Sequence, residues 1–529
     1  MLANIKKYTQ FVIRQDRIIS IIWLSVISAF AVILAAIYPG LFPNEATMQG
    51  IAATMNTPAM IAMMGPVYGL EAVTPALLMN QQCMIWFAIA VMIMNIFFVN
   101  RYTRADEELG RQEMLAALPI GRLTDSMVMV FLSFVLNITV SILIAAFTLV
   151  TQIKGVNIIG ALAYGLSIGM QGFVFAMITL LTAQLFSTAR ACVGVAFAFM
   201  GISYMLRAYG DMNENFASYL SPMGLGLKVE AFYSNNFIPI IILLVKALLI
   251  AVIALFVNTR RDVGAGVFPA RKGRTHASKF LQTPLGFAWR LSRGSFFAWA
   301  VGIFAIGASY GAVVGELDKF VTSNDMFKQM LQGNNGANIL IDSYIAMLSS
   351  MIALLVSIPL ISCINRLRTE EKRGRLESII ATSIPRKTIF GSFILITSLK
   401  SILLIFCGVL GLYFAAYSSG VITFGMLMRS AFVYWPALFV IFSLPVFLVG
   451  VFPKLTSWVW ALFGYSFIIF YFGRLFPDLP AFAIKLSPFG SIPQLPVQKF
   501  SEIPLILLSI IAIGLCMVGI MRFEKRDVK

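Results

Sequence analysis

The chain has 529 residues, of which 59% are apolar and only 12% are charged. Soluble domains are about half apolar and about a quarter charged, so this composition excludes an ordinary soluble enzyme and indicates a polytopic membrane protein. The formal net charge of +17 could suit a nucleic-acid-binding protein, but the basic residues gather on one side of the predicted spans. That bias follows the positive-inside rule, so we expect no nucleic-acid partner.

Apolar stretches long enough to cross a hydrocarbon core as helices recur along the whole chain. Uninterrupted stretches cover residues 18–44, 72–100, 126–153, 155–189, 294–315, 343–365, 401–428, 430–453 and 455–473, and shorter or interrupted ones cover 191–206, 237–258, 389–400 and 503–521. Joining the stretch that ends at Lys400 to the next one gives twelve helices, six in each half. The predicted fold is therefore an all-α polytopic membrane protein with twelve transmembrane helices, arranged as two six-helix repeats that form a pseudo-dimer.

The segment between the first two spans, residues 47–73, is rich in Met, Ala and Gly, and it is interrupted by Pro58 and Pro66. We expect this segment to lie in the outer interface or to dip into the bilayer, with its methionines packed against the outer helix ends. Two short patterns also occur in both halves. They are Arg14-x-x-Arg17, matched by Arg290-x-x-Arg293, and Arg207-x3-Asp211, matched by Arg474-x3-Asp478.

A charged element follows the second span of each half, at residues 104–113 and again at 368–377. Both copies fit the pattern R-x-[DE]-E-x-x-G-R-x-E, at an offset of 264 residues. Glu107 and Arg111 have the i,i+4 spacing of a helical ion pair, which predicts a short surface helix. A solvated loop needs charge but not the same spacing twice, so docking to a cytoplasmic partner is favoured. The residues assigned to this coupling role are Arg104, Glu107, Glu108, Gly110, Arg111 and Glu113 in the first copy, and Arg368, Glu370, Glu371, Gly374, Arg375 and Glu377 in the second.

Two lysines, Lys246 and Lys400, lie about ten residues into their spans, which places them near the middle of the bilayer at the rise of an α-helix. No carboxylate in a predicted span core stands ready to pair with them. An intramembrane charge by default marks a functional site, so both are candidates for lining a transport cavity. Long lysine side chains also snorkel to the interface, and that alternative stays open.

A basic segment near the middle of the chain carries the single histidine, His276. Its glycines and proline predict an irregular backbone. We therefore expect a first six-helix repeat over residues 1–262, a cytoplasmic linker over 263–285 and a second repeat over 286–529. The distribution of Lys and Arg predicts that both termini are cytoplasmic.

The sequence lacks the motifs of a nucleotide-binding or metal-dependent enzyme. It contains no Gly-Lys dipeptide, so a phosphate-binding loop of the G-x-x-x-x-G-K-[ST] type is excluded. One histidine and no cluster of thiols make a metal centre or histidine-based catalysis unexpected. We expect a transport subunit that is not an enzyme and that binds no cofactor itself.

Residues 99–122, which contain the first charged element, resemble the signature of permeases named as exporters of polyketide antibiotics within the type 2 ABC exporter group. Residues 55–66 and 207–224 resemble the external segments of the same family. The resemblance implies a fused twelve-helix membrane subunit in a bacterial plasma membrane, working with two copies of a cytoplasmic P-loop ABC ATPase that binds ATP and Mg. It also implies that the two charged elements are the coupling helices in the ATPase clefts, and that residues 1–17 form an amphipathic connecting helix. The second copy departs from the first, since Arg373 replaces Leu109, so the two docking sites are expected to differ.

Together these features predict the membrane subunit of an ATP-driven exporter for a hydrophobic or amphiphilic compound, such as an antibiotic, a drug or a lipid-like molecule. The alternative is a proton-coupled secondary efflux transporter of the major facilitator kind, which also has two six-helix halves. That alternative usually needs a membrane-embedded carboxylate to carry the proton, and the predicted span cores contain none. A membrane scaffold without transport activity is a third class that the sequence leaves open.

Overall fold

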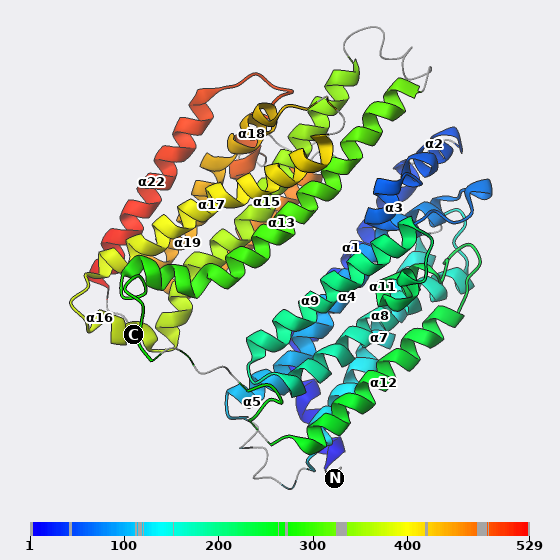
Figure 1. Ribbon diagram of the computed structural model, residues 1–529, viewed down its shortest axis with the longest axis horizontal. Coiled ribbons are helices and arrows are strands. Elements are labelled where there is room, and N and C mark those ends of the chain that lie inside the picture. The colour runs from blue at the N-terminus through cyan, green and yellow to red at the C-terminus, as the bar shows by residue number, and fades with distance from the viewer. Residues whose placement is uncertain are drawn as a thin grey trace. The chain divides into compact units, whose positions relative to one another are not determined.

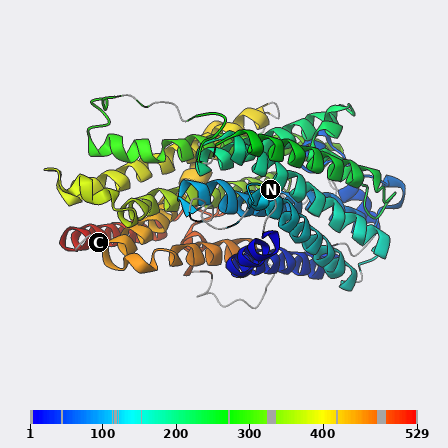
Figure 2. The ribbon, with the colours of Figure 1, turned by 90° about the horizontal axis from the view of Figure 1, so that it is seen from below.

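The computed structural model is helical almost throughout the residues that it describes (Figure 1). Those residues are 4–41, 45–111, 114, 119, 121–151, 153–262, 264–269, 273, 275–323, 336–417, 420, 422–472, 484 and 486–526. The chain divides into two compact units, Met1–Gly273 and Arg274–Lys529. In both views, the long helices within each unit run along a common direction (Figure 1, Figure 2).

The first unit contains long helices joined by short helical segments. Its elements are α1 (Ile5–Leu41), α2 (Glu45–Met55), α3 (Pro58–Met64), η1 (Leu70–Ala72), α4 (Pro75–Asn100), the π-helical η2 (Arg101–Ala105), α5 (Asp106–Glu108), α7 (Thr124–Val150), α8 (Ile158–Leu185), α9 (Ala189–Met212), α10 (Ala217–Leu220), α11 (Pro222–Leu227) and α12 (Ile238–Arg260). Several begin at a side-chain cap: Thr74 accepts from the Leu77 amide at 3.3 Å, and Asn157 accepts from the Gly160 amide at 2.6 Å.

The second unit also consists of long helices joined by short helical segments. Its elements are α13 (Pro284–Ser323), α15 (Gly336–Lys372), α16 (Arg375–Ile380), α17 (Arg386–Ala416), α18 (Phe424–Phe432), α19 (Trp435–Val451), η4 (Pro453–Leu455), α20 (Trp458–Phe472), η6 (Pro488–Ser491) and α22 (Glu502–Lys525). In each unit, small residues let neighbouring helices approach closely. A Cβ atom at Gly165 of α8 would lie 2.2 Å from the Ser141 carbonyl oxygen of α7, and one at Gly450 of α19 would lie 2.2 Å from the Gly519 carbonyl oxygen of α22.

Helix α8 forms the centre of the first unit and packs against α4, α7 and α12. Beside it, the side chains of Asn95 and Asn137 exchange two hydrogen bonds of 2.9 and 2.8 Å, which fasten α4 to α7 within the apolar interior. Paired amides satisfy each other's donors and acceptors where no water is available. By contrast, α12 exposes a row of large apolar side chains, among them Ile241 and Val252, as expected of a helix that faces lipid.

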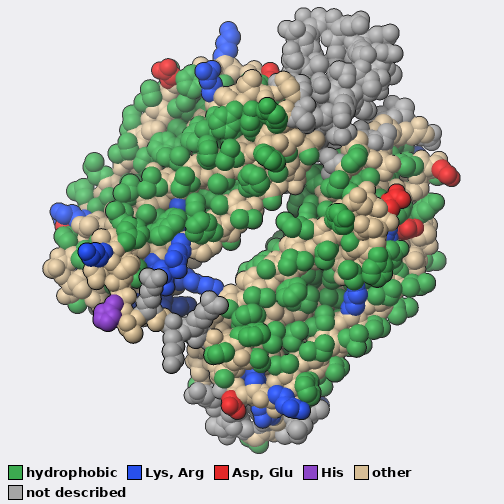
Figure 3. All heavy atoms as spheres, in the orientation of Figure 1, with side chains coloured by type: hydrophobic (Ala, Val, Ile, Leu, Met, Phe, Trp, Pro, Cys, Tyr) green, Lys and Arg blue, Asp and Glu red, His purple; other side chains and the backbone are tan. Residues whose placement is uncertain are grey.

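Eleven helices among the described residues are long and apolar enough to cross a membrane, and a shorter apolar helix covers Trp458–Ile469. Apolar side chains cover the visible sides of both units, whereas many of the charged side chains lie at their ends (Figure 3). The prediction of an all-helical, multi-pass membrane protein is therefore confirmed. The number of twelve spans and their arrangement as two repeats stay predictions.

The first span corrects one expectation about the N-terminal segment. From Ile5 onward, the segment assigned to an amphipathic connecting helix continues without a break into α1, which ends at Leu41. Asp16 thereby lies inside a helix and is only 4% exposed, although the apolar stretch in the sequence begins two residues later.

Candidate coupling site and candidate cavities

Up to Glu108, the first charged element continues the second span and does not begin a separate surface helix as predicted. One helical run extends from Pro75 to Glu108 and includes the π-helical turn η2. The run stops at Gly110, whose φ of +72° is left-handed and is readily adopted only by glycine. In the second unit, α15 likewise extends to Lys372, and Gly374 has a φ of +68°. A short helix, α16, follows only after that turn.

Glu107 is bound by two arginines of its own unit. Its carboxylate pairs with Arg104 at 2.8 Å and with Arg261, just beyond the end of α12, at 2.6 Å. The Gly264 amide also donates to this carboxylate at 2.7 Å. The Glu107 side chain is only 3% exposed, so a carboxylate predicted to face a partner is instead held within the chain.

The second unit contains the same arrangement. Glu371 pairs with Arg368 at 2.8 Å and with Arg526, just beyond the end of α22, at 2.5 Å, and its side chain is 1% exposed. We call Arg104, Glu107 and Arg261 the first clasp, and Arg368, Glu371 and Arg526 the second clasp. Each clasp joins the end of the second long span of its unit to the end of the last one.

A further arginine adds a third helix to each clasp. Arg122, just before α7, donates to the Arg261 carbonyl oxygen at 2.5 Å, and Arg386, at the start of α17, donates to the Arg526 carbonyl oxygen at 2.7 Å. Arg122 and Arg386 are themselves 264 positions apart. In each unit, two helix ends therefore meet at one carboxylate, and a third is bonded to the backbone of the arginine that pairs with it.

Sequence reasoning missed Arg261 and Arg526, although a signal for them was present. Each begins an Arg-Asp-Val tripeptide, at residues 261–263 and 526–528. Their offset is 265 residues, one more than that of the charged elements. Because both tripeptides follow the last apolar stretch of a half, they could have been matched to the two glutamates.

The other motif residues have different surroundings. Arg111 pairs with Asp106 at 2.8 Å and not with Glu107, because the left-handed turn at Gly110 ends the helix that the i,i+4 spacing assumed. Arg375 pairs in the same way with Glu370 at 2.7 Å. Glu113 lies outside the described residues. The exposed residues of the two turns, which we call the first and second tips, are Glu108, Leu109 and Arg111, and Lys372, Arg373, Arg375 and Glu377.

Lys246 and Lys400 have unrelated environments. The Lys246 ammonium donates to the carbonyl oxygens of Tyr219 at 2.8 Å and Leu220 at 3.3 Å, at the end of α10. Lys400 is 3% exposed, and its ammonium lies 3.8 Å from the Cys363 sulfur and 5.3 Å from the centre of the Trp289 ring. Neither lysine lines the two pockets described below, so their assignment to a transport cavity stays a prediction.

We expect Lys400→Met to stabilise the protein and Lys246→Met to destabilise it. An intramembrane lysine costs about 3 kcal/mol on insertion scales, and cation–π contacts return about 2 kcal/mol when desolvated, so Lys400→Met should gain about 1 kcal/mol. Lys246→Met relieves the same insertion cost of about 3 kcal/mol but removes two hydrogen bonds from a charged donor, worth about 1.5 to 3 kcal/mol each, so the net result should be a loss of up to about 3 kcal/mol. Thermal midpoints of the two purified variants test the contrast. Equal shifts in the same direction would contradict these assignments.

On the opposite side of the first unit from its clasp, Arg207 anchors the segment between the first two long helices. This fully buried side chain donates to the carbonyl oxygens of Ile61, Ala62 and Met63 at 3.1, 2.8 and 3.2 Å, at the end of α3, and it lies 3.8 Å from the Asp211 carboxylate. Met60 and Met63 are buried in the same region, which fits the expected packing role. The matching residues Arg474 and Asp478 lie outside the described part of the chain.

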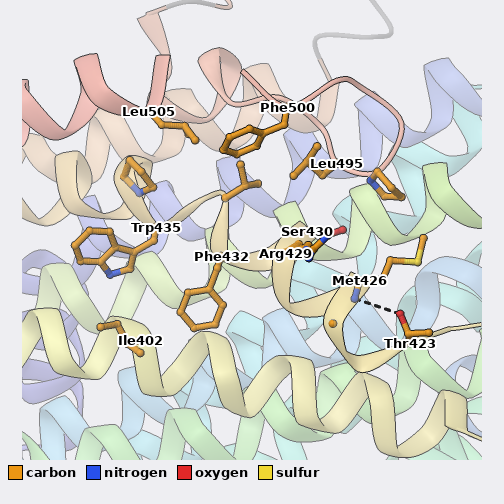
Figure 4. Close-up of a pocket in the computed structure, with 14 residues that line it drawn as sticks. Ile402, Thr423, Met426, Arg429, Ser430, Phe432, Trp435, Leu495, Phe500 and Leu505 are labelled. Carbon is orange, nitrogen blue, oxygen red and sulfur yellow. Dashed lines mark hydrogen bonds between the residues drawn. The ribbon is translucent and has the colours of Figure 1, made fainter. Parts of the chain in front are cut away.

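A cavity of about 1200 Å³ lies within the second unit, between α17, α18, α19 and the segment before α22 (Figure 4). Trp435, Phe432 and Phe500 line it, together with Met426 and the cation Arg429. Leu505, near the start of α22, lines this cavity, and the other end of α22 lies next to the second clasp, so the cavity lies toward the end of the unit away from the clasp. Large aromatic-lined cavities with few polar groups are typical sites for apolar ligands.

Two comparisons relate the chain to known proteins. A family model described as the C-terminal domain of the multidrug efflux system permease Rv1217c matches residues 281–524. The chain is also 30% identical over 533 residues to the multidrug efflux system permease protein Rv1217c of Mycobacterium tuberculosis (strain ATCC 25618 / H37Rv), with 98% of this chain and 94% of that protein covered. The family model thus matches most of the second unit, and the relative aligns with both.

Proposed function

The chain belongs to the family of multidrug efflux system permeases that contains Rv1217c, and from this premise we propose that it is the membrane subunit of an ABC exporter. Its cargo is a hydrophobic or amphiphilic compound, such as an antibiotic, a drug or a lipid-like molecule, which it moves out of a bacterial cell. Its twelve helices form two six-helix repeats, with both termini in the cytoplasm. Two copies of a separate P-loop ATPase hold ATP and Mg and supply the energy.

The observation that carries this proposal is the pair of clasps. Both units place an exposed tip directly beside a clasp that joins two helix ends at a buried carboxylate and a third through the backbone of the clasp arginine. A force applied to Leu109 in the first tip or to Arg373 in the second would therefore reach the second, third and last spans of that unit together. Such a junction suits a subunit that is driven from outside by a partner, because small shifts are passed through rigid packed helices.

The cavity of the second unit supports the proposed cargo class. Its volume exceeds the roughly 300–1000 Å³ of typical ligand sites, and its walls are mainly apolar and aromatic. Arg429 adds one cation to that lining, and Ser430 and Thr423 add hydroxyl groups (Figure 4). These features suit an amphiphile with a large apolar part and a few polar groups.

Transport into inverted membrane vesicles separates this proposal from the proton-coupled alternative. With the ATPase present, a fluorescent amphiphile should accumulate when ATP and Mg are added. An imposed pH gradient without nucleotide should drive no accumulation, because the proposed exporter takes its energy from the ATPase, although α1 carries Asp16 as a buried carboxylate of the kind that a secondary carrier uses for its coupling proton. Vesicles without the permease give the background. Accumulation driven by the gradient alone would favour a proton-coupled transporter of the major facilitator kind.

A further inference from the structure

A second, smaller pocket lies in the first unit between α1 and α4, close to the charged end of α4. Its volume is about 300 Å³, the lower end of the range for small-molecule sites. Trp23, Phe97, Phe98 and Met94 form much of its wall. The polar groups that line it come mainly from Asp16, Asn100 and Arg101. It is distinct from the cavity of the second unit and from both clasps.

The pocket contains two buried oxygen acceptors. Asp16 accepts from the Tyr102 hydroxyl at 2.8 Å and from the Ser20 hydroxyl, and it forms a long ion pair of 3.8 Å with Arg101, whose side chain is 46% exposed. Asn100 is 8% exposed, and its side-chain oxygen has no hydrogen-bond partner. An unsatisfied buried acceptor costs about 1 to 3 kcal/mol, so a ligand that brings a hydrogen-bond donor recovers that loss.

The second unit lacks both acceptors at the corresponding positions. In the Arg-x-x-Arg pattern, Asp16 is replaced by Ser292, whose hydroxyl donates to the Ala288 carbonyl oxygen at 2.6 Å within its own helix. At the offset of the charged elements, Asn100 is replaced by Ile364, which is fully buried. A pocket lined by these two acceptors is therefore not needed to pack the same helices in the other unit.

We propose that this pocket binds the ammonium group of an amphiphilic amine, with Asp16 and Asn100 accepting its N–H hydrogens. The positive charge lies against the Asp16 carboxylate and near the faces of Trp23 and Phe98, where cation–π attraction adds to binding. The alkyl or aromatic part of the amine extends past Phe97, which is 47% exposed. This inference rests on the proposed function, because it gives the exporter an amine-selective site beside the tip of its first unit.

The test is binding of dodecylamine to the purified full chain in nanodiscs of phosphatidylcholine and phosphatidylglycerol, measured by equilibrium dialysis without ATPase or nucleotide. Dodecyltrimethylammonium has the same charge but no N–H group, so it should bind at least about tenfold more weakly. Asp16→Asn should weaken dodecylamine binding by at least about tenfold, because it removes the charge that faces the ammonium.

Asn100→Leu provides a second variant in case Asp16→Asn fails to fold. It removes an acceptor that has no partner in the chain, so the thermal midpoint should not fall, yet dodecylamine should bind severalfold more weakly. Ser292→Ala is the matched control and should bind like the wild type. Unchanged dodecylamine affinity in Asn100→Leu, or equal binding of the two probes to the wild type, would overturn the proposal.

The ammonium could come from an exported amine or from a lipid headgroup, and a further arm separates the two. Adding phosphatidylethanolamine to the nanodiscs should leave dodecylamine binding unchanged if the site selects a free amphiphile, and should weaken it if the lipid headgroup competes. Both results are consistent with a site that binds ammonium groups, and they differ only in the source of the ligand. Because no ATPase is present, loss of binding would refute this site without touching the proposal of an ATP-driven exporter.

Discussion

Glu371→Gln should lower the stability of the protein by about 3 to 5 kcal/mol, the usual result of breaking a buried ion pair by removing one partner. The substitution keeps the size of the side chain but leaves Arg368 and Arg526 without their shared carboxylate. Both arginines are largely buried, so water can replace the lost partner only in part. The thermal midpoint of the purified variant measures the effect.

Glu377→Gln is the matched control for that experiment. Glu377 belongs to the same motif but is exposed on α16, and removing an exposed charge usually changes stability by less than about 1 kcal/mol. The same comparison in the first unit uses Glu107→Gln against Glu108→Gln. Equal effects of the buried and exposed substitutions would mean that the clasps do not hold the helix ends together.

The clasps show what sequence patterns can and cannot predict at this site. The glycine that both charged elements share, Gly110 or Gly374, marks the turn in the backbone, because glycine takes up left-handed conformations without strain. The partner of Glu107 was predicted wrongly as Arg111, four residues away. Its actual partners are Arg104, three residues away, and Arg261, 154 residues away, and helical periodicity contains no information about the second contact.

The membrane fold was easier to predict, because long apolar stretches report directly on span formation. The stretch over residues 126–153 corresponds closely to α7, which runs from Thr124 to Val150. Helix ends were harder, since charged residues can continue a helix beyond the hydrocarbon core. Asp16 was missed for this reason: it precedes the first apolar stretch, yet α1 carries it into a pocket against Asn100.

The contacts of Lys246 are a second feature that the sequence could not predict. Its position in the sequence is near the middle of a span, and the default interpretation of such a charge is a transport pathway. The structure places its ammonium on the carbonyl oxygens of Tyr219 and Leu220, while its assignment to a transport pathway stays a prediction. Sequence alone could not predict this contact, because it depends on how the segment between α9 and α12 folds back against the helix.

Docking of the ATPase through the two tips is the central claim, and reversing or adding charge at both tips should abolish it. Leu109 and Arg373 occupy corresponding positions in the two charged elements, and both are exposed outside the clasps. Leu109→Glu places an uncompensated charge in the first docking surface, and Arg373→Glu reverses one in the second. Like-charge contacts across an interface cost several kcal/mol, so the double variant should retain at least about tenfold less ATPase than the wild type.

Co-purification of the ATPase with the detergent-solubilised double variant is the most direct measurement of this claim. Lys154→Glu serves as the control, because Lys154 is an exposed charge beyond the far end of α7 from the first clasp, and it should leave the retained ATPase unchanged. The free energy of unfolding of the double variant, followed through its thermal midpoint, should also stay within about 1 kcal/mol of the wild-type value, since neither residue belongs to a clasp. The account predicts a folded permease that has lost its ATPase. A folded double variant that retains the ATPase at the wild-type ratio would contradict it.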